Sequence, residues 1–327
     1  MGGQTSIEIN DIIAFVTSPQ VQDLRPVAGA PRLSSAGGPL LREISVVDET
    51  GERRRLQVPV ERPLKIIIDG QELVTLMTLG ARPELLVLGY LRNQRIVGAV
   101  TEIESINVDT GAGSAVVQLR AAGSAAAISV HKPGSACGLG TVFGDWMMHD
   151  DAPASLRDST PLAGTPSEWT GPIGTGGPGW PVGVGTAPGW PARLSRAALL
   201  RMLEITREHD AVHRTAGSVH GCALFQGADL LVSIEDVSRH NGLDTVTGWM
   251  LLHGVAGGDK TLFTTGRLTG EMVMKAAHNG VSIMVSRNGV TSMGYELAVK
   301  FKMALFGRAA KGRYLCYTGL ERFDADL

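Results

Sequence analysis

The sequence predicts an α/β protein, with an α+β N-terminal portion followed by a three-layer α/β/α domain. From Ser195 onwards, strand-like and helix-like runs alternate, which is typical of helices packed on both faces of a sheet. Residues 41–150 instead contain mainly β-type runs separated by turn signals. With 327 residues, 43% of them apolar, the chain is long enough to bury a sizeable core.

Composition excludes several classes of protein. The formal net charge of -2 argues against general nucleic-acid binding. Three cysteines are too few for a disulfide-built fold and indicate a reducing compartment. The start of the chain lacks the basic region of a secretory signal, and no apolar run is long enough to span a bilayer. We therefore expect a soluble cytoplasmic protein without nucleic-acid or membrane partners.

The N-terminal portion is predicted from turn and helix signals. Residues 1–40 have weak periodicity and scattered Pro, Gly and Ser, which predicts a flexible arm. In 63–80, two β-rich runs flank Asp69-Gly70, a pair that favours a tight hairpin turn. Pro83 suits the first turn of a helix that extends to about 94. The segment 104–120 predicts a second hairpin.

An unusual segment separates the two portions of the chain. In 171–191, 13 of 21 residues are Gly or Pro, a density that no regular element tolerates. Residues 151–193 are therefore predicted to be an inserted loop or linker, either protease-sensitive or covering a partner surface with Trp180 and Trp190. Its deletion should leave the core folded.

The C-terminal portion, residues 194–327, carries the alternating pattern. Ser195 is a good N-cap for a helix over 196–210. The strands are predicted at 229–236, 260–266 and 281–287, the helices at 242–254, 269–280 and 292–303, and a final strand pair at 304–319.

The stretch "EDVSRHNGLDTVTG", Glu235–Gly248, resembles the signature of the FdhD family of formate dehydrogenase accessory sulfurtransferases. The runs "ELLVLGYLRNQRIV", "AGSVHGCA" and "FGRAAKGRYLCYT" are similar to family segments in the same order. This resemblance implies a C-terminal domain like the cytidine deaminase fold. It also implies a homodimer that takes sulfur from a cysteine desulfurase and passes it to bis-molybdopterin guanine dinucleotide, carrying molybdenum or tungsten. The recipient of the cofactor is then apo formate dehydrogenase or a related enzyme.

Cys137 is the residue that the resemblance identifies as the sulfur carrier. It lies in "GSACGLG", where the family has Cys-Gly-x-Cys-Gly, so Gly140 replaces the second cysteine. A carrier needs one thiolate, and a glycine-rich loop lets the sulfur reach two partners. The alternative is that Cys137 only fills space. The missing second cysteine also favours a second function, a cofactor-binding chaperone that moves no sulfur.

The other two cysteines are predicted to be structural. Cys222 is expected in the core near the start of a helix, and Cys316 in a strand. A zinc deaminase needs His-x-Glu and Pro-Cys-x-x-Cys, and this sequence has neither. No metal site is therefore predicted.

Polar residues gather at two predicted strand-to-helix turns. Glu235, Asp236, Arg239 and His240 form either a site that positions the cofactor or a buried ion-pair network with Asp236 as helix cap. Arg267 follows the next strand in a Gly-rich turn that could receive an anion. His220 of the "SVHGCA" run is a further supporting residue.

The stretch "GRAAKGR", residues 307–313, is the predicted cofactor-binding segment. Three cations and two glycines in seven residues can meet a pyrophosphate and a guanine edge. The alternative is a solvated basic hairpin tip. The family's cofactor-binding segment falls on Arg308, Ala309, Ala310, Lys311, Gly312 and Arg313.

Overall fold

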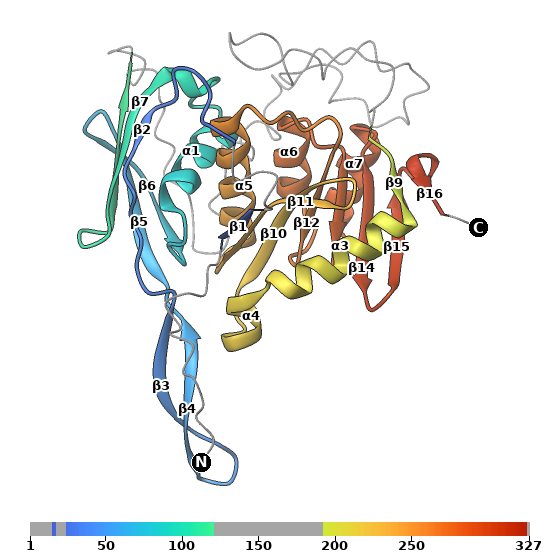
Figure 1. The fold of residues 1–327 in the computed structure, drawn as a ribbon, viewed down its shortest axis with the longest axis horizontal. Coiled ribbons are helices and arrows are strands. Elements are labelled where there is room, and N and C mark those ends of the chain that lie inside the picture. Colours follow the sequence, from blue (N-terminus) through green and yellow to red (C-terminus); the bar gives the residue numbers. More distant parts are fainter. Residues whose placement is uncertain (1–14, 18–23, 121–191, 326–327) are drawn as a thin grey trace.

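The computed structural model of the chain describes residues 15–17, 24–120 and 192–325. The Cys137 loop and residues 151–191 of the predicted insertion lie outside these ranges. The described residues form two large β-sheets that meet through a pair of helices, and a β-hairpin projects away from them (Figure 1). The predicted mixed α/β class is confirmed.

The larger sheet has seven strands among the described residues, in the order β1–β11–β10–β12–β13–β14–β15. Strands β12, β13 and β14 run parallel, whereas the other neighbouring pairs are antiparallel. Their bounds are β1 (Phe15–Thr17), β10 (His220–Gln226), β11 (Asp229–Asp236), β12 (Lys260–Thr264), β13 (Ile283–Ser286), β14 (Ala304–Ala310) and β15 (Arg313–Thr318).

Helices cover both faces of this sheet, which confirms the predicted three layers. Leu262 of β12 packs in the cluster that includes α5, α6 and α7, whereas its neighbour Phe263 packs in the cluster that includes α3. The α3 helix begins after Ser195, whose Oγ accepts a hydrogen bond from Ala198 N at 3.1 Å, as its predicted N-cap role requires. The helices are α3 (Arg196–His209), the short α4 (Ala211–Ala216), α5 (Arg239–His253), α6 (Gly270–His278) and α7 (Ser292–Lys300).

The smaller sheet lies in the N-terminal portion and has the order β2–β7–β8–β5–β6. Asp69 and Gly70, with φ angles of 45° and 85°, turn the chain from β5 to β6, so the predicted hairpin is confirmed. The second predicted hairpin is β7 with β8. The bounds are β2 (Arg32–Leu33), β5 (Arg62–Ile68), β6 (Gln71–Thr78), β7 (Ile103–Asp109) and β8 (Ser114–Leu119).

The remaining elements are short or peripheral. The projecting hairpin consists of β3 (Leu41–Val47) and β4 (Arg53–Pro59). A two-residue pairing joins β9 (Leu194–Ser195) to β16 (Phe323–Asp324), and two single 3₁₀ turns are η2 (Val100–Glu102) and η6 (Leu320–Arg322). No helix in the described part of the chain is long and apolar enough to cross a membrane.

Two glycines bring the N-terminal and C-terminal portions into contact. Helix α1 (Pro83–Asn93), which begins at Pro83 as predicted, packs along α5. A Cβ atom at Gly89 would lie 1.7 Å from the Asp244 carbonyl oxygen, and one at Gly248 would lie 2.0 Å from the Leu85 carbonyl oxygen. The two helix backbones therefore touch, and the two portions share one hydrophobic core.

Part of the predicted flexible arm pairs with both sheets. β1 lies antiparallel to β11, and β2 lies parallel to β7. Between them, Val27 N donates a hydrogen bond to Leu252 O at 2.9 Å. Segment 1–40 was expected to be a flexible arm, but some of its described residues form β-strands. Local periodicity could not predict this, because the strands pair with others that are distant in the sequence.

Candidate functional site

One edge of the larger sheet collects most of the predicted site residues. The parallel strands β12, β13 and β14 all end at this edge. Antiparallel pairing brings the end of β11 and the start of β10 to the same edge, with His220 opposite Asp236. Helices α5, α6 and α7 begin here. We call it the carboxyl edge, and in open α/β sheets such edges are where ligands bind.

The loops of the carboxyl edge are joined to one another by backbone hydrogen bonds. Thr265 N donates to Gly221 O at 2.9 Å, and Leu268 N donates to Gly289 O at 3.0 Å. Arg308 N donates to Asn288 O at 2.8 Å. The start of β10 with His220, the loop that carries Arg267 and the end of β14 with Arg308 are therefore neighbours in a single row.

Positive charge accumulates around His220. Burial lowers the pKa of this half-buried imidazole, and the positive charges of Arg239, His213 and Arg267 lower it further. The Arg239 side chain packs against the loop that carries Arg267, because a Cβ atom at Gly266 in that loop would lie 2.7 Å from the Arg239 Cδ. The structure thus brings the predicted residues His220, Arg239 and Arg267 together.

The predicted cofactor segment forms the tip of the β14–β15 hairpin. Arg308, Lys311 and Arg313 are exposed there, so their charges are available to an anion. The tip turns through Lys311 and Gly312, at φ angles of 52° and 77°, and Arg308 also has a positive φ of 51°. Ala309 is fully buried in the hydrophobic cluster that includes residues of α3. Ala310 and Gly312 are exposed at the tip.

Glu235 is engaged in holding a helix. Its two carboxylate oxygens accept hydrogen bonds from Val212 N and His213 N, both at 2.8 Å, at the start of α4. Burial raises the pKa of Glu235 to about 7. This arrangement is the buried network of the alternative interpretation, in which the carboxylate stabilises a turn.

Asp236 joins the two portions of the protein. It accepts hydrogen bonds from Thr78 Oγ1 at 2.5 Å and Leu79 N at 3.1 Å, and from Ser238 N and Asn241 Nδ2 on its own side. Burial raises its pKa to about 6. The N-cap residue of α5 is Ser238, not Asp236 as predicted, because the strand continues through Asp236 before the helix begins.

The two described cysteines are structural. Cys222 is fully buried in β10, where its Sγ donates to Thr264 Oγ1 at 3.3 Å, and burial raises its thiol pKa to about 12. The predicted core position is confirmed, but the predicted helix start is wrong, since the pairing of β10 with β11 and β12 makes this segment a central strand. Cys316 lies in β15 as predicted, and burial raises its thiol pKa.

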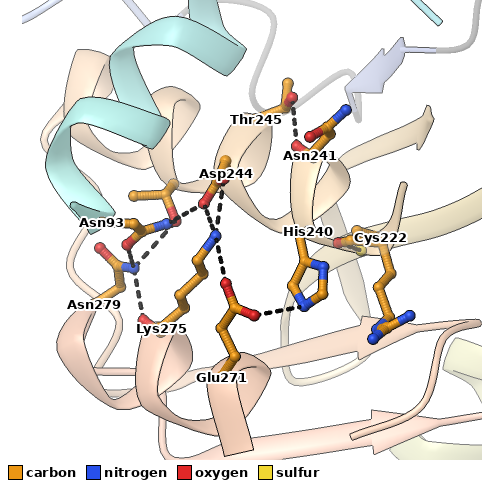
Figure 2. Close-up of polar contacts among 11 residues, drawn as sticks. Asn93, Cys222, His240, Asn241, Asp244, Thr245, Glu271, Lys275 and Asn279 are labelled. Atoms are coloured by element: carbon orange, nitrogen blue, oxygen red, sulfur yellow. Dashed lines mark hydrogen bonds and ion pairs between the residues drawn. The ribbon is translucent and has the colours of Figure 1, made fainter. Parts of the chain in front are cut away.

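A buried ion pair that sequence reasoning missed lies behind the carboxyl edge. Lys275 Nζ is 2.9 Å from both carboxylate oxygens of Asp244, and Asn93 Nδ2 donates to Asp244 Oδ1 at 2.6 Å (Figure 2). Asn279 Nδ2 donates to Asn93 Oδ1 at 2.8 Å. The available signal was an acidic residue within the apolar run "GLDTVTGWMLL", because charges inside buried helices are almost always paired.

Glu271 connects this pair to the carboxyl edge. Its Oε1 lies 3.8 Å from Lys275 Nζ, and its Oε2 lies 3.2 Å from Nε2 of His240. His240, predicted as a supporting residue, is thus the end of a polar chain that starts at Asn93 on α1 (Figure 2). Among the described residues, no group of three His, Cys, Asp or Glu side chains is arranged to hold a metal ion.

The fold and the edge define a class of protein: a three-layer α/β/α domain with an attached β-rich unit and a cation-lined carboxyl edge suited to an anionic ligand. The chain belongs to the FdhD/NarQ family, whose model matches residues 59–164 and 182–324. The predicted family resemblance is therefore confirmed.

Relatives of this chain match over most of its length. It is 27% identical over 282 residues to the sulfur carrier protein FdhD of Halalkalibacterium halodurans, which covers 85% of this chain and 93% of the relative. It is also 27% identical over 278 residues to the sulfur carrier protein FdhD of Bacillus subtilis, and the match covers 84% of this chain and 94% of that relative. A solved structure of a candidate formate dehydrogenase accessory protein from Desulfotalea psychrophila shares the fold, with a TM-score of 0.62 and 22% sequence identity. The match covers 86% of this chain and 98% of that chain.

Proposed function

We propose that this chain is a sulfur carrier that accepts persulfide sulfur on Cys137 and delivers it to bis-molybdopterin guanine dinucleotide. The relatives bear the name of sulfur carrier, and the chain has three cysteines to supply the thiol. The observation that carries the proposal is that two of them are unsuited: Cys222 and Cys316 lie in strands, with thiol pKa values raised by burial. A raised pKa leaves little of the thiolate that sulfur exchange requires.

The chemistry on Cys137 is a thiol exchange. The Cys137 thiolate attacks the outer sulfur of a persulfide on a cysteine desulfurase. A new S–S bond forms on Cys137 as the donor S–S bond breaks, and the donor cysteine leaves as a thiolate, so one thiolate is consumed and one is released. Cys137 then holds the sulfur as a persulfide for the cofactor, with no net oxidant needed.

The cargo is an anionic dinucleotide, and the exposed cations fit it. Arg308, Lys311 and Arg313 at the hairpin tip, with Arg267 in the adjoining row of loops, would hold its pyrophosphate and guanine groups. The proposal includes apo formate dehydrogenase or a related molybdenum or tungsten enzyme as recipient, a homodimer and a cytoplasmic location, as in the family resemblance.

The test is intact-protein mass spectrometry after incubation with a cysteine desulfurase and cysteine. The wild type should gain sulfur atoms that a reductant removes. Cys137→Ser should gain none, whereas the matched controls Cys222→Ser and Cys316→Ser should gain as much as wild type. A Cys137→Ser protein that still becomes persulfidated would contradict the carrier role. If it also supports its partner enzyme, a cofactor-binding chaperone without sulfur transfer is the better description.

A further inference from the structure

The β3–β4 hairpin is anchored at the carboxyl edge. Leu41 at its base packs in a small hydrophobic cluster with Val212 of α4 and with Val219, the residue before His220. Beyond this cluster the hairpin extends past α4, on the side of the molecule where the β14–β15 tip lies (Figure 1). A macromolecule that approaches the carboxyl edge from this side therefore meets the hairpin.

One face of the hairpin is apolar and does not belong to the core. The antiparallel register places Ile44 opposite Leu56, and the alternation of side chains places Val46 and Val58 on the same face. None of the four belongs to a hydrophobic core cluster of the described residues, and Leu56 is 51% exposed. We call these four side chains the apolar face.

The apolar face is the side of the hairpin that gains from a cover. An isolated two-stranded hairpin is only marginally stable in water, and contiguous exposed apolar side chains mark interaction sites. The opposite face is mainly polar and partly paired within the hairpin, since Arg55 donates to Glu43 at 3.0 Å. Beyond the base, this opposite face carries Glu43, Ser45, Val47, Arg53, Arg55 and Gln57.

The charges beside the apolar face indicate the kind of partner. The strands place two charged side chains on this face, and both are arginines: Arg42 opposite Val58, and Arg54 opposite Val46. Arg54 lies 2.5 Å from Asp48, whereas no acidic side chain within the described ranges forms an ion pair with Arg42. Two such faces packed together would bring like charges into contact, so the charges favour a partner with carboxylates over a second copy.

We propose that the apolar face docks the enzyme that receives the cofactor, through a surface of that enzyme on which carboxylates flank apolar side chains. This inference rests on the proposed function, because that function supplies both the cofactor at the carboxyl edge and its recipient. The base of the hairpin packs against residues next to that edge, so an enzyme bound to the hairpin lies beside the site from which it takes the cofactor.

The first test removes the apolar contact. Surface plasmon resonance measures the affinity of the chain for the apo formate dehydrogenase of the same organism, prepared without its cofactor. Leu56→Glu should weaken this affinity by about tenfold or more, because it replaces an apolar contact with a carboxylate that faces other carboxylates. The matched control is Val47→Glu, a 64% exposed position on the opposite face of the same hairpin, which should stay within about twofold of wild type.

The second test reverses one charge. Arg42→Glu should weaken the affinity by about fivefold to tenfold and should reduce its dependence on salt, since it removes an attraction to a carboxylate of the partner. Arg53→Glu changes the net charge of the chain by the same amount on the opposite face. It should stay within about twofold of wild type, so the difference between the two variants reports the position of the charge and not its total.

The remaining outcomes are decisive. Equal affinities for the Leu56→Glu and Val47→Glu proteins would overturn the inference. So would analytical ultracentrifugation in which Leu56→Glu halves the particle mass but keeps the affinity for the enzyme, because the face would then belong to a second copy. If Leu56→Glu does not fold by circular dichroism, Arg42→Glu against Arg53→Glu decides. A wild type that does not bind the apo-enzyme contradicts the docking role, while the gain of sulfur on Cys137 still decides the carrier function by itself.

Discussion

Lys275 Nζ contacts both carboxylate oxygens of Asp244 at 2.9 Å, and each of these side chains is only 2% exposed. The residues belong to α6 and α5, and Asn93 adds a third helix to the pair through a 2.6 Å hydrogen bond. A buried charge without its partner is costly, whereas the complete pair is tolerated. The ion pair therefore makes the junction of α1, α5 and α6 sensitive to loss of either partner.

Removing one partner should destabilise the protein strongly. We expect Lys275→Met or Asp244→Ala to lower the free energy of unfolding by about 3–5 kcal/mol, since each leaves an uncompensated buried charge. Urea denaturation followed by circular dichroism measures this. The double variant Asp244→Ala/Lys275→Met should recover part of the loss. Single variants within about 1 kcal/mol of wild type, the range of an exposed pair, would show that the pair is not buried in solution.

Alanine at the helix contact should also destabilise. A Cβ atom at Gly89 would lie 1.7 Å from the Asp244 carbonyl oxygen, so α1 and α5 must separate to admit it. We expect Gly89→Ala to lower the free energy of unfolding by about 3 kcal/mol, the upper range for overpacking. This loss exceeds the gain of about 1 kcal/mol from better helix propensity.

The control for this contact is Gly37→Ala, where nothing lies within 4 Å of the added Cβ atom. It should melt close to wild type in a thermal scan. Equal melting temperatures for the Gly37→Ala and Gly89→Ala proteins would mean that the helices do not touch there.

The stability of the protein should depend on pH through Glu235. Burial raises its pKa from 4.5 to about 7 in the folded state. As the pH rises, the unfolded chain releases this proton first. The stability that the folded protein gains from binding this proton more tightly is therefore fully present below pH 4.5 and is lost as the pH passes 7. The full change is on the order of 3 kcal/mol.

The measurement is the free energy of unfolding of wild type and Glu235→Gln between pH 4 and 8, by urea denaturation. Wild type should lose stability relative to the variant across this window, because the glutamine does not titrate. Parallel pH profiles for the two proteins would show that the Glu235 pKa is the same in the folded and unfolded chains.

The basic hairpin tip should bind a guanine nucleotide. Lys311→Ala and Arg313→Ala should each weaken guanosine diphosphate binding, because each removes a charge-assisted hydrogen bond worth about 1.5–3 kcal/mol. Isothermal titration calorimetry measures the affinity. Arg201→Ala is the control, since this exposed arginine belongs to α3 rather than to segment 307–313 and pairs with Glu204. If affinity does not change in the tip variants, the nucleotide site lies elsewhere, and Arg267 with His240 becomes the better candidate.

Several elements were predictable because their causes are local. The Asp69-Gly70 turn follows from two residues that accept a positive φ, and the start of α3 follows from one side chain, Ser195, bonding three residues ahead. The family resemblance likewise rests on contiguous runs such as Glu235–Gly248. Each of these signals lies within a short window of the chain.

The sequence by itself thus determined the α/β class, most helices and strands, the family and the identity of the candidate cations. Only the tertiary structure decided that Cys222 lies in a central strand, that Asp244 pairs with Lys275, and that Glu271 lies 3.2 Å from His240. These relations join residues up to tens of positions apart, and they depend on strand pairing and helix packing. Local propensity cannot encode them, because the free energy of a buried pair exists only once both helices have docked.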